Sequence, residues 1–100
     1  MRTRKCFLEM VRCRDPNIVT NSVEYIKVKK VINILYKYYT LYDLDNGTIH
    51  SKIIEILYLT DKTYTYQKVA DKLFISISTL KRYIKQYERL AEIIYNQENI

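Results

Sequence analysis

The chain has 100 residues, which is enough for one domain with a single modest hydrophobic core. Its formal net charge of +6 suits a polyanionic partner but does not choose between DNA, RNA and an acidic protein. Lysines interrupt the longest apolar region, and the apolar run near the N-terminus is too short for a signal peptide, so we expect no membrane span and a cytoplasmic protein.

Glycine and proline each occur once, so the chain has few breaks and an all-α fold is predicted, a small helical bundle. We expect one compact domain with three parts. Residues 1–20 form a basic N-terminal segment, residues 21–60 a helical scaffold or dimerisation region, and residues 61–100 a helix-turn-helix with an extended C-terminal helix and no wing.

The basic N-terminal segment contains a possible short helix from about Arg4 to Arg12, ended by the turn at Pro16. Two interpretations of this segment stay open. Its arginines can form an arm that touches phosphate or a minor groove, or the segment is a partly frayed terminus.

The first clear helix is predicted from Asn21, which can cap it with Glu24 in the capping-box position, to about Tyr42. Its apolar stripe comprises Val28, Val31, Ile32, Leu35, either Tyr38 or Tyr39, and Tyr42. Because the stripe is wide, we expect this helix to be the scaffold or a dimer interface.

A break is predicted from Asp43 to Gly47, and we interpret it as a helix-to-helix loop because helical patterns flank it. Thr48 can cap the next helix, which ends near Thr60. The core side chains expected on that helix are Ile49, Ile53, Ile56 and Leu57.

The stretch from Tyr64 to Lys85 has the pattern of a helix-turn-helix. In its first helix Val69, Ala70 and Leu73 share one face, and the small Ala70 permits close helix approach. Ser76 occupies the N-cap position of the second helix, where it can accept a hydrogen bond from the N–H of Ser78 or Thr79.

The second helix buries Leu80 and Ile84 and continues to about Tyr95 without a stop signal. The turn position that usually holds glycine is Phe74. We expect either a right-handed or a strained backbone there, with the side chain either partly exposed or packed on a neighbour.

The outward face of helix 77–86 predicts major-groove reading of duplex DNA. Arg82 suits a bidentate contact to guanine, Lys81 and Lys85 suit bases or phosphate, and Ile77 suits a thymine methyl. The first helix is expected to cross the DNA backbone near its start. The candidate DNA-contacting residues are Ser76, Ile77, Ser78, Thr79, Lys81, Arg82, Lys85, Tyr66, Gln67 and Lys68.

From Ile49 onward, about half of the chain resembles a sigma-factor region 4 type helix-turn-helix, in particular phage late-gene regulators of the RinA/ArpU type. The matching pieces are IIEILYL (53–59), KVADKLFIS (68–76), STLKRYIK (78–85) and RLAEII (89–94). The resemblance implies a bacterial or phage transcriptional regulator that reads DNA with Ser78, Lys81, Arg82 and Lys85.

Other function classes compete with DNA binding. Helix 21–42 can instead engage RNA polymerase or another host factor, or a second copy of the chain. An enzyme is not expected, because the sequence has no glycine-rich phosphate loop and no acidic cluster. Cys6, Cys13 and His50 are too scattered for a zinc site, so we expect no metal and no cofactor.

Overall fold

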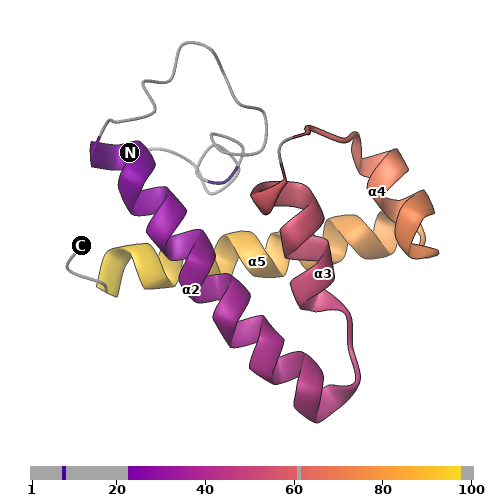
Figure 1. The fold of residues 1–100 in the computed structure, drawn as a ribbon, viewed down its shortest axis with the longest axis horizontal. Coiled ribbons are helices and arrows are strands. Elements are labelled where there is room, and N and C mark those ends of the chain that lie inside the picture. Colours follow the sequence, from indigo (N-terminus) through magenta and orange to yellow (C-terminus); the bar gives the residue numbers. More distant parts are fainter. Residues whose placement is uncertain (1–7, 9–22, 61, 98–100) are drawn as a thin grey trace.

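The computed structural model describes residue 8, residues 23–60 and residues 62–97, and the regular elements in these ranges are all helical, without a strand. The elements are α2 (Val23–Asn46), α3 (His50–Ile54), the π-helix η1 (Glu55–Leu59), α4 (Tyr66–Leu73) and α5 (Ile77–Gln97). The predicted all-α bundle is confirmed. Figure 1 shows α5 running through the middle of the bundle. Helix α2 crosses the C-terminal half of α5, and α4 packs near the N-terminal end of α5.

Helix α2 follows the predicted apolar stripe, with Val28, Val31, Ile32 and Leu35 fully buried. Of the two adjacent tyrosines, Tyr39 belongs to the core and Tyr38 is 50% exposed. Tyr42, expected in the stripe, is also exposed. The predicted Asn21 cap lies outside the described residues.

The predicted end of this helix at Tyr42 is wrong, because α2 continues to Asn46. Gly47 then adopts a left-handed backbone with φ +64°, and its N–H donates to the Asp43 carbonyl at 2.8 Å. Glycine takes this conformation without a steric cost and commonly ends a helix. The helix-to-helix connection is therefore confirmed, but it is shorter than predicted.

The cap of α3 comes from Asp43 at the end of α2, and the predicted cap Thr48 is wrong. One Asp43 carboxylate oxygen accepts the N–H of His50 at 3.0 Å and the Thr48 hydroxyl. The other accepts both the N–H and the hydroxyl of Ser51, each at 2.7 Å. Asp43 thereby satisfies two backbone donors that the start of a helix leaves free.

The start of α3 also sets which of its side chains enter the core. His50, Ile53 and Ile54 are buried, and Leu57 and Tyr58 follow them in η1. The predicted core residue Ile49 is instead 41% exposed, and Ile56 is only half-buried. The buried stripe is thus centred about one residue away from the predicted one.

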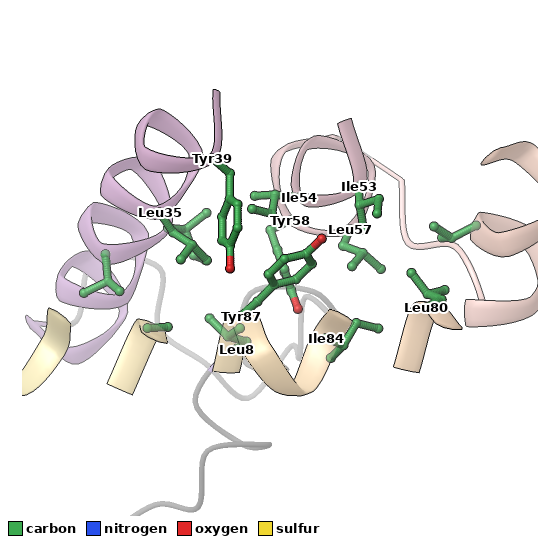
Figure 2. Close-up of a cluster of buried hydrophobic side chains, with 14 of the residues drawn as sticks. Leu8, Leu35, Tyr39, Ile53, Ile54, Leu57, Tyr58, Leu80, Ile84 and Tyr87 are labelled. Carbon is green, nitrogen blue, oxygen red and sulfur yellow. The ribbon is translucent and has the colours of Figure 1, made fainter. Parts of the chain in front are cut away.

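The core lies between α2, α3 and α5, and Figure 2 shows their side chains converging. Tyr87 of α5 is fully buried at its centre, and Leu8 also belongs to it with 1% exposure. The basic segment therefore contributes at least one core side chain. Leu8, within the predicted short helix, is helical, and the rest of that helix and the basic arm lie outside the described residues.

Candidate nucleic-acid interface

Helix α4 forms the first half of the predicted helix-turn-helix. It begins at Tyr66, two residues later than predicted, because the Thr65 hydroxyl caps it by accepting the Lys68 N–H at 3.2 Å. Val69 and Ala70 are fully buried, as their spacing predicted. The sequence interpretation missed Thr65, although threonine before an amphipathic stretch is a recognised start signal.

The turn between the two helices is closed by Phe74 in a left-handed conformation, with φ 57° and ψ 40°. Its N–H donates to the Asp71 carbonyl at 3.3 Å, and the Ile75 N–H donates to the Ala70 carbonyl at 3.1 Å. A residue with a Cβ loses about 1–2 kcal/mol in this region. The Phe74 side chain is 95% exposed, so the strained alternative holds and no packing compensates it.

Ser76 starts α5 as predicted. Its Oγ accepts the Thr79 N–H at 3.1 Å, which confirms the cap and selects Thr79 over Ser78 as the backbone donor. The Ser76 hydroxyl also donates to Thr79 Oγ1 at 2.8 Å and lies 3.2 Å from Ser78 Oγ. These contacts hold the helix N-terminus, so the first role of Ser76 and Thr79 is to position the residues that follow.

The outward face of α5 gathers the predicted cations. Leu80 and Ile84 are buried on the opposite side, while Ile77 and Thr79 lie half-buried at the margin. The exposed side chains on this face are Ser78, Lys81, Arg82 and Lys85. We refer to these four residues as the reading face.

Arg89 continues the reading face by one turn and was not among the predicted residues. It is exposed and follows Lys85 by four positions, which places both on one side of the helix. This i, i+4 spacing is readable in the sequence, but the expected groove contact ended at residue 86.

Arg82 is supported by a tyrosine that the sequence did not single out. Its guanidinium carbon lies 5.6 Å from the centroid of the Tyr83 ring, within the range of a cation–π contact. The Tyr83 ring meets the buried His50 edge-on, with centroids 4.7 Å apart. Arg82 therefore rests on a ring that is itself anchored to the core.

The first turn of α4 carries the remaining predicted contacts. Gln67 and Lys68 are exposed and Tyr66 is half-buried. The Gln67 amide donates to Asp71 Oδ1 at 3.0 Å, which holds it along the helix. The positive end of the α4 dipole and the Lys68 charge together favour a nearby anion.

No protein-family model, curated protein or solved structure matches this chain. None of the helices in the described ranges is both long and apolar enough to cross a bilayer. The function is therefore inferred from the residues and geometry of the chain itself.

Proposed function

We propose that the chain is a sequence-specific DNA-binding transcriptional regulator that inserts the N-terminal half of α5 into the major groove. The observation that carries the proposal is the reading face, a row of exposed cations and a hydroxyl on the capped helix α5. The short helix α4 comes directly before it, as in a helix-turn-helix. The resemblance to sigma region 4 and RinA/ArpU-type regulators supports the same function and a bacterial or phage origin.

The residues of the reading face suit different contacts. The planar fork of Arg82 matches the two acceptors that guanine presents in the major groove. Lys81 and Lys85 lie within one turn of it and suit neighbouring bases or phosphates. Gln67 and Lys68 lie at the start of α4, where a helix-turn-helix crosses the DNA backbone, so we assign them to phosphate.

Selection of bound duplexes from a random library tests this proposal. The wild-type protein is expected to enrich one sequence motif, and Arg82→Ala is expected to lose about 1–3 kcal/mol and to relax one base position. Lys68→Ala serves as the matched control, because loss of a phosphate contact weakens every sequence alike. No enrichment by the wild-type protein would contradict sequence-specific binding.

The exposed apolar side chains of α2 favour a second candidate function, contact with a host protein such as RNA polymerase. Tyr38, Leu41 and Leu44 are 50%, 66% and 79% exposed. Purified RNA polymerase that retains the wild-type protein but not Leu41→Asp, in the absence of DNA, would support this function. Equal retention of both proteins would contradict it.

A further inference from the structure

We propose that the outward face of α2 binds a second copy of this chain, with the two α2 helices antiparallel and crossing at Leu41. The proposal goes beyond DNA binding and does not depend on it. It rests on three properties of this face: exposed apolar side chains, the ring contacts that hold one of them, and self-complementary charges.

The apolar side chains lie on the side of α2 that faces away from the core. Successive helical residues are rotated by about 100°, so Tyr38, Leu41 and Leu44 lie within about 60° of one line along the helix. Fully buried Ile32 lies about 180° around the helix from Leu41. Leu35, also fully buried, lies about 60° from Tyr38, so Tyr38 is at the edge of this side. Tyr38, Leu41 and Leu44 therefore form an apolar patch that nothing in the described part of the chain covers.

Part of this patch is already held in place before any partner binds. The Tyr38 ring meets the Tyr39 ring edge-on at 5.0 Å and the tilted Tyr42 ring at 6.2 Å between centroids. Tyr39 is buried, so these contacts fix Tyr38 against the core. A side chain that is already ordered loses less conformational entropy on association.

The charges at the two ends of the patch indicate which partner binds it. Lys37 lies four residues before Leu41 and Asp45 four residues after it, and both are exposed. When two α2 helices cross antiparallel at Leu41, Lys37 of one copy is level with Asp45 of the other, and the two-fold axis repeats this pairing.

Other arrangements lack this match. A parallel pair would set Lys37 beside Lys37 and Asp45 beside Asp45, and it would also align the two helix dipoles unfavourably. An unrelated protein is not expected to carry an acidic and a basic side chain in the reverse order at the same spacing. The self-complementary charges therefore point to a second copy, and the short contact predicts a weak interface at the low end of the usual size range.

Sedimentation equilibrium from about 1 μM to 1 mM, a range suited to a weak interface, tests the proposal. The wild-type protein is expected to dimerise. Lys37→Asp and Asp45→Lys each turn both symmetric attractions into repulsions, and each is expected to weaken dimerisation about tenfold. The double variant Lys37→Asp/Asp45→Lys restores the attraction and is expected to dimerise like the wild type.

Mixing the two single variants gives an independent result, because every charge pair in their heterodimer is again attractive. Lys62→Asp, in the loop before α4, is the matched control for net charge and is expected to leave dimerisation unchanged. Leu41→Ala removes an exposed contact without entering the core, so it is expected to weaken the dimer while leaving the helical circular-dichroism signal intact.

A wild-type protein that stays monomeric over the whole range would overturn the proposal. Dimerisation that all these variants share equally would also overturn it, since another surface would then be responsible. Monomeric behaviour together with tight binding of RNA polymerase would reassign the face to a different protein.

Discussion

His50 Nδ1 lies 2.6 Å from the Tyr87 hydroxyl oxygen inside the core, and this contact joins the start of α3 to α5. Burial raises the pKa of Tyr87, so its hydroxyl stays protonated, and the tautomer of His50 sets which of the two side chains donates. Burial also lowers the pKa of His50, although the nearby Asp43 carboxylate opposes the shift. The pair is therefore a hydrogen bond between two neutral side chains at pH 7.

Tyr87→Phe should destabilise the protein by about 1–3 kcal/mol, because the buried His50 nitrogen loses its hydrogen-bond partner while the ring packing remains. Chemical denaturation of the wild type and the variant measures the difference. Tyr42→Phe is the matched control, since its ring also contacts His50, at 5.7 Å, but its hydroxyl belongs to an exposed residue. Equal stability of all three proteins would show that the contact contributes nothing.

The stability should fall as the pH is lowered below 6.5. A histidine whose pKa is lowered in the folded state binds fewer protons there than in the unfolded chain, so stability rises with pH between the folded value and the unfolded value of 6.5. Stability is fully retained above 6.5 and declines below it. His50 is the only histidine, so urea unfolding of His50→Gln from pH 5 to 7 should lose this slope. A slope that persists in the variant would place the titrating group elsewhere.

Asp43→Ala should cost about 2 kcal/mol, because it leaves the α3 donors without their cap. Burial alone would raise the pKa of Asp43, but hydrogen bonds from Thr48, Ser51 and His50 outweigh it and lower that pKa below 3.8. The contribution of the cap is therefore present above pH 3.8 and is lost as the pH falls through the folded value. Asp45→Ala, two residues later and exposed, is the control. Denaturation midpoints, measured at protein concentrations below the dimerisation range, should be lower for Asp43→Ala than for Asp45→Ala.

Phe74→Gly should stabilise the protein by up to about 1 kcal/mol. Glycine removes the left-handed strain, which outweighs the added freedom of the unfolded chain, and no packing is lost from a side chain that is 95% exposed. Phe74→Ala keeps the Cβ and the strain, so it should change little. Thermal unfolding compares the three proteins, and a less stable glycine variant would mean that Phe74 makes a contact that stabilises the fold.

The helix-turn-helix could be predicted closely because its signals are local. The Ser76 cap, the buried Leu80 and the length of α5 all follow from spacing within a few residues. Such short-range patterns are set by helical periodicity and capping, which the neighbouring sequence determines.

The Asp43 cap and the His50–Tyr87 contact could not be predicted in the same way. Asp43 lies seven residues before the N–H that it accepts, on a different helix, whereas capping signals are sought next to the helix they start.

The sequence also left Tyr38 and Tyr39 as alternatives. Packing decides between them, because the Tyr39 ring meets the rings of His50 and Tyr87 at 4.9 and 5.1 Å.

The most direct test of DNA binding is fluorescence anisotropy of random duplex DNA titrated at two salt concentrations. We compare the wild type with Lys81/Arg82/Lys85→Ala and with Lys30/Lys52/Lys62→Ala, which removes the same charge from exposed positions elsewhere. The wild type and the control variant should bind, and their affinity should fall steeply with salt as counterions are released. The reading-face variant should not bind. Absence of binding by the wild type at low salt, or equal binding by both variants, would contradict DNA recognition by α5.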